Sequence, residues 1–293
     1  MTARKPLALL FLISFSISAQ IKGVVKDSIS GNSIAFVSIW VENENIGTTS
    51  EENGEFIINT TDKSQKLIFN ALGFEKKTVK SSRASLVYLK PVAFQLNEVV
   101  ISKRMETKVL EIGKAKNQIY QAFDNGPRID VKFFPYSPEY KKTKYLQKVA
   151  IYTDSKIENA TIKIHFFNTD SNGFPGEELL NNDFVVTVKK GVVKNIFDVR
   201  KLNLIMLKSG IFVGFEKLII EKNKLEKTIT DFNTNKTQIQ KTYYPFVLYS
   251  YVEREFLYTF SGGKWDRQTN YNKTDSSHKI MVYEPMINLI LTN

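Results

Sequence analysis

The stretch that decides the fold class is Ala35–Glu42, which reads AFVSIWVE and alternates along its length. Side chains of a β-strand point to opposite faces in turn, so this pattern predicts a strand with one wholly apolar face. That face carries Ala35, Val37, Ile39 and Val41, and the opposite face carries Phe36, Ser38, Trp40 and Glu42. A strand of this kind indicates a sheet that packs against a second layer.

Short β-rich runs flank this stretch at regular intervals. Turn residues separate them, as in Ser30-Gly31-Asn32 and Glu52-Asn53-Gly54, and no helical period intervenes. Such spacing favours an antiparallel sandwich over alternating strands and helices. The predicted strands of this first domain are Ile21–Lys26, Ala35–Glu42, Glu55–Thr60, Lys66–Leu72, Phe74–Lys80 and Leu86–Lys90.

Strand alternation resumes near residue 143. Because the pattern again lacks a helical period, we expect a second, jelly-roll-like β-sandwich over residues 143–293. The fold class is therefore all-β. The predicted strands are Tyr145–Thr153, Ala160–Phe167, Phe184–Lys189, Val192–Val199, Gly210–Glu221, Phe246–Phe260 and Lys279–Tyr283.

Residues 20–102 contain an ordered series of short motifs. They are IKGVVKD at Ile21–Asp27, SIAFV at Ser33–Val37, GTT at Gly47–Thr49, NGEF at Asn53–Phe56, ALGF at Ala71–Phe74 and LNEVVI at Leu96–Ile101. In this order they resemble the carboxypeptidase-regulatory-like domain found in cell-envelope proteins of Gram-negative bacteria. The resemblance implies a seven-stranded, transthyretin-like sandwich without chemistry of its own.

Residue types that carry catalysis or bind metals are scarce. The chain has no cysteine and two histidines, His165 and His278. A zinc carboxypeptidase needs a His-x-x-Glu pair, but the third residue after each histidine is Asn168 or Met281. His165 shares the polar face of its strand with Lys163, which predicts a surface position. We therefore expect a protein that is not an enzyme, with no catalytic residue, no metal and no cofactor.

One loop has the composition of a cation site. Asn168–Gly173 (NTDSNG) places oxygen donors at alternate positions before a glycine, as a calcium loop does. An EF-hand needs Asp at the first position and Glu at the twelfth, and these are Asn168 and Leu179. A hairpin loop is the favoured interpretation, with cation binding left open.

Residues 1–19 have the features of a secretory signal. Arg4 and Lys5 precede the uncharged run Leu7–Ile17, and small residues Ser18 and Ala19 follow. The run is shorter than the roughly 20 apolar residues that cross a bilayer. We expect export, no transmembrane span after cleavage, and a location in the periplasm or at the outer membrane. The lack of cysteine favours a bacterial envelope, and an uncleaved N-terminal anchor is the alternative.

A short, basic and partly helical connector is predicted at residues 103–142. Residues 103–148 hold 11 Lys+Arg against 5 Asp+Glu, and the whole chain has a net charge of +11. This excess indicates a peripheral contact with an anionic envelope surface, or else a solvated linker. No nucleic-acid-binding motif accompanies it, so nucleic acid is not an expected partner. The candidate contacts are Lys103, Arg104, Lys108, Lys114, Lys116, Lys141, Lys142 and Lys144.

Two aromatic residues form the other candidate site. Phe36 and Trp40 share one face of their predicted strand, where flat rings can stack on a sugar or contact a partner. The favoured alternative is that they bury against the second domain or the connector. Trp265 follows Gly262-Gly263 and is predicted to lie in a hairpin that packs on the second sandwich.

These observations lead to three functional hypotheses. The first is a non-catalytic, secreted cell-envelope protein that binds or scaffolds, with an envelope protein or a glycan as its partner. The second is a carbohydrate-binding module for envelope or extracellular glycans. The third is a hydrolase with an unrecognised carboxylate site, although the chain has no nucleophile elbow and no glycine-rich phosphate loop.

Overall fold

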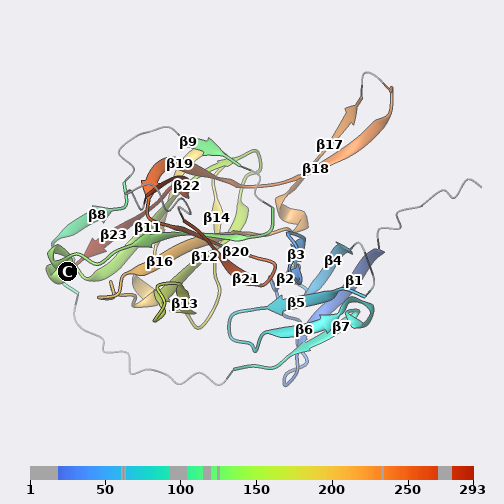
Figure 1. Cartoon of the computed structure of the whole chain (residues 1–293), viewed down its shortest axis with the longest axis horizontal. Helices are drawn as coiled ribbons and strands as arrows, with labels where there is room; N and C mark the ends of the chain where they lie inside the picture. The colour runs from blue at the N-terminus through green and yellow to red at the C-terminus, as the bar shows by residue number, and fades with distance from the viewer. Residues whose placement is uncertain are drawn as a thin grey trace, which may run out of the picture.

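The computed structural model describes residues 19–60, 62, 64–92, 104–114, 120–123, 126–231, 234–269 and 279–293. Within them the chain forms two β-sandwiches side by side along the long axis of the molecule (Figure 1). Short 3₁₀ turns are the helical elements of the described part. None of its helices is long and apolar enough to cross a membrane. The 3₁₀ turns are η1 (Ser81–Arg83), η2 (Pro138–Lys142), η3 (Arg200–Leu202) and η4 (Glu221–Asn223).

The first sandwich has seven strands in two sheets, β1 to β7, which confirms the number that the resemblance implied. Its apolar side chains meet between the sheets, where Val25, Phe69 and Leu89 are all 0% exposed. One sheet has β1 (Ala19–Asp27) between β4 (Glu55–Thr60) and β7 (Leu86–Leu89). The other has the order β3 (Gly47–Thr49), β2 (Ser38–Val41), β5 (Lys66–Asn70) and β6 (Lys77–Lys80).

Strand β2 confirms the predicted apolar face but starts later than predicted. Val37, Ile39 and Val41 are fully buried in the core of the first sandwich. Phe36 precedes the strand in a turn, with a backbone φ of 54°. Trp40 is 1% exposed although it lies on the face that alternation assigned as polar. That face is buried because the second sandwich covers it.

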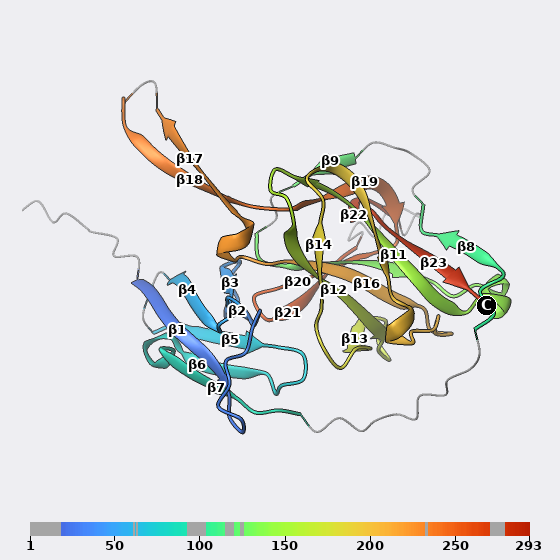
Figure 2. The ribbon, with the colours of Figure 1, turned by 180° about the vertical axis from the view of Figure 1, so that it is seen from behind.

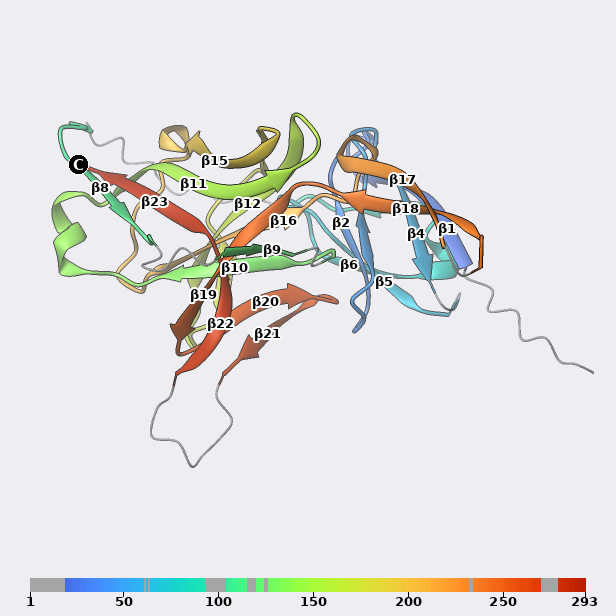
Figure 3. The ribbon, with the colours of Figure 1, turned by 90° about the horizontal axis from the view of Figure 1, so that it is seen from above.

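The second sandwich also consists of two sheets (Figure 3). The first has the order β13 (Pro175–Glu178), β12 (Ala160–Thr169), β16 (Ile211–Lys217), β10 (Ile129–Phe134), β20 (Leu257–Ser261) and β21 (Lys264–Gln268), with β14 (Phe184–Val188) also paired to β12. The second has the order β22 (Ile280–Pro285), β19 (Phe246–Arg254), β11 (Tyr145–Ser155), β23 (Ile287–Thr292) and β8 (Val109–Ile112), with β15 (Gly191–Asp198) paired to β11 and β9 (Tyr120–Ala122) paired to β19.

The core of the second sandwich lies between these sheets. Alternate residues of β12 point into it, so Ile162, Ile164 and Phe166 are at most 1% exposed. They meet apolar residues of the facing sheet, such as Val149 and Leu289. The other face of β12 carries Lys163 and His165 and is turned away from this core.

The predicted connector is not a separate linker. Residues 109–134 supply β8, β9 and β10 to the sheets of the second sandwich, and β10 lies in the middle of its sheet. Where the local spacing favoured a helix, the described residues form β8 and β9 instead, and the helical element of the described connector is the 3₁₀ turn η2 at its end. The physical reason is that β8 pairs with β23 and β10 pairs with β16, both distant in the chain. These long-range ladders override the weak local helical spacing.

Two hairpins complete the fold. The loop at Asn168–Gly173 joins β12 to β13, where Asp170 Oδ1 accepts hydrogen bonds from the backbone N–H groups of Asn172 and Phe174. This confirms the predicted hairpin loop. The second hairpin, β17 (Lys224–Thr230) with β18 (Thr237–Tyr243), was not predicted and extends away from the second sandwich (Figures 1 and 2).

Candidate functional site

The candidate site lies where the first sandwich covers β12 and β16 of the second. Lys163 and His165 are two residues apart on β12, so both side chains leave the same face of the sheet. Glu216 lies on the neighbouring strand β16, where it pairs in register with Lys163. Glu178, on the edge strand β13, lies on the other side of β12. The sheet thus brings two cations and two carboxylates together.

His165 lies between two carboxylates. Its Nδ1 is 2.9 Å from Oε2 of Glu178, and its Nε2 is 3.2 Å from Oε2 of Glu216. The other oxygen of Glu178 accepts the backbone N–H of Phe166 at 2.6 Å, which holds this carboxylate in place. The ring also stacks on Phe167, with centroids 5.6 Å apart.

This environment keeps the imidazole protonated. Burial by itself lowers the pKa of His165, but the charges and hydrogen bonds of Glu178 and Glu216 outweigh burial and raise the pKa to about 10. For Glu216, burial raises the pKa, while His165 and Lys163 lower it further than burial raises it. At neutral pH the site therefore holds an imidazolium between two carboxylates.

Lys163 links this cluster to the first sandwich. Its Nζ is 2.9 Å from Oδ2 of Asp183 and donates a hydrogen bond to the backbone carbonyl of Phe36. The Lys163 side chain is 2% exposed, so these partners replace the water that it gives up on burial. Ser38 of β2 also hydrogen-bonds the carboxylate of Glu216. The polar cluster of the second sandwich thus contacts Ser38 at the start of β2 and Phe36 just before it.

The surface position predicted for His165 is wrong. Alternation correctly placed His165 and Lys163 on one face, but the first sandwich and the β20–β21 hairpin cover that face. The partners Glu178, Asp183 and Glu216 were not among the predicted site residues. One feature of the sequence could have indicated these residues. Charged side chains interrupt strands that are otherwise apolar, as in IKIHF at 162–166 and IFVGFEK at 211–217.

A cleft of about 600 Å³ opens beside the cluster, between the two sandwiches. Both domains contribute to its wall, and the side chains that a ligand would meet include Asn70, Phe74, Asn181, Phe260 and Trp265. His165 uses both ring nitrogens on carboxylates, so it cannot act as a base or bind a metal at neutral pH. Among the described residues, no group of His, Asp and Glu could hold a metal ion.

The aromatic candidates take part in the domain interface. The indole Nε1 of Trp40 donates a hydrogen bond to the carbonyl of Pro127 at 3.3 Å, and its ring meets Phe260 edge to face at 5.2 Å. Trp40 is therefore not accessible to a sugar. It is buried against the second domain, which is the favoured alternative of the sequence analysis. Trp265 lies in the predicted hairpin, β20–β21, and packs on Phe167 and Phe260.

The cationic candidates divide into three groups. Lys103 and Lys116 lie outside the described residues. Lys114 pairs with Glu111 at 2.9 Å, at the end of β8 that is remote from Lys108. The remaining five lie near the C-terminus. Lys108 binds Asn293, Arg104 lies over the ring of Tyr145, and Lys141, Lys142 and Lys144 come just before Tyr145, which pairs with Thr292. We call this group the cationic end: Arg104, Lys108, Lys141, Lys142 and Lys144.

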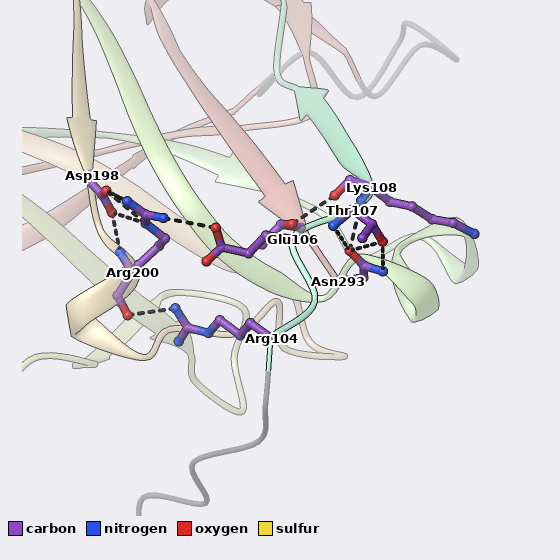
Figure 4. Close-up of polar contacts among 8 residues, drawn as sticks. Arg104, Glu106, Thr107, Lys108, Asp198, Arg200 and Asn293 are labelled. Carbon is purple, nitrogen blue, oxygen red and sulfur yellow. Dashed lines mark hydrogen bonds and ion pairs between the residues drawn. The ribbon is translucent and has the colours of Figure 1, made fainter.

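Polar contacts hold the cationic end together. Arg104 donates to the backbone carbonyl of Arg200 at 2.7 Å (Figure 4). It also donates to Oδ1 of Asn203 at 2.9 Å. Its guanidinium and the ammonium of Lys144 each lie 5.2 Å from the ring centroid of Tyr145. The backbone N–H of Lys108 is bound to Oδ1 of Asn293 at 2.9 Å. The chain's last residue thus fixes the segment that carries Lys108.

The acidic groups nearby are mostly paired. Arg200 contacts Glu106 at 2.9 Å and also binds Asp198 (Figure 4). Glu139 in η2 is the acidic residue beside Lys141 and Lys142. Lys108, Lys141, Lys142 and Lys144 are exposed, so the end presents a surplus of positive charge to solvent.

Comparison with known proteins defines the first sandwich. Residues 21–101 match the family of the CarboxypepD_reg-like domain. The first sandwich is therefore a CarboxypepD_reg-like domain, as its sequence motifs indicated. No curated protein matches the chain.

Three solved structures from infectious bursal disease virus align loosely with most of the chain. The T=1 particles derived from infectious bursal virus align at 9% identity and a TM-score of 0.22, over 93% of this chain and 58% of that one. The Gx strain of infectious bursal disease virus aligns at 9% identity and 0.21, over 94% and 72%. The VP2 subviral particle of that virus aligns at 9% and 0.20, over 94% and 64%. TM-scores this low carry no inference about this chain.

Proposed function

We propose that this protein is an exported, non-catalytic scaffold of the bacterial cell envelope, which binds an anionic envelope surface through its cationic end. In this proposal the CarboxypepD_reg-like domain is held away from that surface and presented to an envelope protein. The signal-like residues 1–19 are the basis for export. The partner of the first sandwich is not identified.

The observation that carries the proposal is the position of the cationic end. It lies beside the C-terminus, at the end of the molecule opposite the first sandwich (Figures 1 and 3). A molecule with a charged surface at one end and a separate domain at the other has the form of a spacer. Clustered exposed lysines attract anionic headgroups at about 1 kcal/mol each.

A second observation supports a scaffold over a hydrolase. The charged residues beside the interdomain cleft are bound to one another, and His165 is an imidazolium at neutral pH. Such a cluster fastens two domains together, whereas a general base must be free to accept a proton. The two sandwiches then act as one rigid unit with a set length.

The test is binding of the full chain to vesicles that contain anionic or only zwitterionic lipid, followed by co-sedimentation. We expect binding to the anionic vesicles that weakens as salt rises. Changing Lys141, Lys142 and Lys144 to Gln together should weaken binding by about 3 kcal/mol, or ~100-fold.

The matched control changes Lys156, Lys189 and Lys190 to Gln. These three exposed lysines lie on the same sandwich but at the opposite end of β11, and the change in net charge is the same. We expect nearly unchanged vesicle binding in this control. Equal loss in both triple variants would contradict the proposed cationic end.

Glycan binding remains a second candidate because of the interdomain cleft. Trp265 and Phe74 line it together with the amides of Asn70 and Asn181, and sugars are bound by aromatic rings and amides of this kind. Asn181→Ala should weaken binding to a panel of envelope polysaccharides, whereas Asn172→Ala, in the exposed β12–β13 loop, should not. If the panel shows no binding, the glycan function is wrong.

A further inference from the structure

A second cavity lies in the second sandwich, away from the interdomain cleft. Its volume is about 540 Å³, within the range of roughly 300–1,000 Å³ that is usual for small-molecule sites. The register pairs β20 with β10 at Ile129, Asp130 and Val131, and the cavity opens beside the following residues of β10. Its wall is mainly apolar and includes Ile112, Phe133, Phe134, Phe212, Phe256 and Leu257.

One end of this cavity carries two cations that share one carboxylate. Lys132 Nζ lies 3.1 Å from Oε2 of Glu284. Arg254 binds the same carboxylate through Nε at 2.6 Å and Nη2 at 2.7 Å. The side chains of Lys132 and Glu284 are each 5% exposed, and that of Arg254 is 41% exposed. The cluster therefore has one more positive than negative charge, and two of its three charged groups are shielded from water.

Lys132 is not fully bonded by the protein. An ammonium has three donors, and Lys132 uses two, on Glu284 and on the carbonyl of Gly113 at 2.6 Å. No acceptor for the third donor is found in the part of the chain that the structure describes, and the ammonium lies 5.5 Å from the ring centroid of Phe134. Burial lowers the pKa of Lys132 by more than Glu284 raises it. An additional anion would offset this cost.

The other charges at the cavity do not remove the surplus. Lys279 and Glu253 pair with each other at 3.3 Å and are both more than half exposed. Glu255 lies exposed at the turn between β19 and β20. Solvent screens these groups, whereas the Lys132–Glu284 pair is buried.

We propose that this cavity binds a carboxylate amphiphile of the size of a medium-chain fatty acid. The apolar chain lies among the phenylalanines, and the carboxylate binds Lys132 and Arg254. The aromatic wall selects an apolar body, and the surplus positive charge selects an anionic head over a neutral or cationic one. This site is independent of the proposed scaffold function.

The test is titration calorimetry of the full chain with three ligands of equal chain length, each below its micelle concentration. They are dodecanoate, dodecanol and dodecyltrimethylammonium. We expect dodecanoate to bind at one site, at least about tenfold more tightly than dodecanol, because only the carboxylate forms charge-assisted hydrogen bonds with Lys132 and Arg254. Equal affinity for all three ligands, or no binding of dodecanoate, would overturn the proposal.

Two variants locate the bound carboxylate. Arg254→Gln should weaken dodecanoate binding about tenfold and leave dodecanol unchanged, since the half-exposed guanidinium can be replaced without emptying the core. Lys156→Gln, at an exposed lysine just after β11 and at the end of β19 opposite Arg254, controls for attraction to a basic protein and should change neither affinity. If Lys156→Gln weakens dodecanoate as much as Arg254→Gln does, the binding is unspecific and the site is wrong.

Discussion

The ammonium of Lys163, on β12 of the second sandwich, donates a hydrogen bond to the backbone carbonyl of Phe36 in the first. Phe36 has a φ of 54°, a conformation that non-glycine residues seldom adopt. A charge-assisted hydrogen bond to its carbonyl offsets the cost of that conformation. The contact joins the polar cluster of the second sandwich to the turn that leads into β2, and it couples the two domains.

Removing this ammonium should loosen the interface. Lys163→Met leaves Asp183 without its cation and Phe36 without its donor, so we expect the free energy of unfolding to fall by about 3 kcal/mol. Urea denaturation of the full chain measures this change. Lys222→Met, at an exposed lysine of η4, is the control and should change stability by less than about 0.5 kcal/mol. Similar losses in both variants would argue against the coupling.

The imidazolium of His165 makes stability depend on pH. Its pKa is about 10 in the folded protein, above the usual value of roughly 6.5, so its contribution is complete below pH 6.5 and is lost as the pH rises toward 10. We expect a loss on the order of 3 kcal/mol over this window.

His165→Gln isolates this effect. The variant should be less stable at pH 7, because Glu178 and Glu216 then face each other without a cation. Its stability should also change much less than that of the natural protein between pH 7 and pH 10. Denaturation curves at several pH values give both quantities. A slope that is the same in both proteins would show that another group titrates.

Close approach of the domains at Gly263 provides a steric test. A Cβ at Gly263 would overlap Cδ1 of Ile68 in the first sandwich, which is the end of a side chain that can turn aside. Gly263→Ala should therefore lower stability by about 1 kcal/mol beyond the cost of its positive φ. Gly173→Ala is the control, since its φ of +81° is similar but no atom lies within 4 Å of the added Cβ.

A second change can rescue this clash. Ile68→Val removes the Cδ1 atom, so Gly263→Ala should cost less in the Ile68→Val background than in the natural protein. Thermal unfolding of the four proteins of this cycle measures the coupling. Additive effects would mean that the two residues are not in contact in solution.

The local pattern was sufficient for much of the β-structure. Alternation placed the apolar face of β2 and the inward face of β12 correctly, because burial on one side of a sheet selects every second residue. Turn residues with positive φ, such as Gly31 and Gly54, separated the strands as expected. The ordered motifs of residues 21–101 identified the first domain.

Local pattern failed where the partner of a strand is distant. Strand β10 (IDVKFF) contains Asp130 and Lys132. Because of these charges, the sequence pattern assigned the segment to a basic connector. Both residues are buried, Asp130 at 2% and Lys132 at 4% exposure. Asp130 can be buried since it accepts hydrogen bonds from the hydroxyls of Tyr249 and Thr259, and Lys132 can be buried since it pairs with Glu284. These partners lie more than 100 residues away in the chain.

The same reason explains the candidate site. Sequence composition determined that the chain is all-β and basic, and that its chemistry would rest on carboxylates, lysines and two histidines. Only the folded chain decided that His165 lies between Glu178 and Glu216, and that Trp40 is covered. A single strand shows which side chains share a face. What covers that face depends on how the two sandwiches pack together. This packing decides which residues between them are exposed and which charged partners each of them meets.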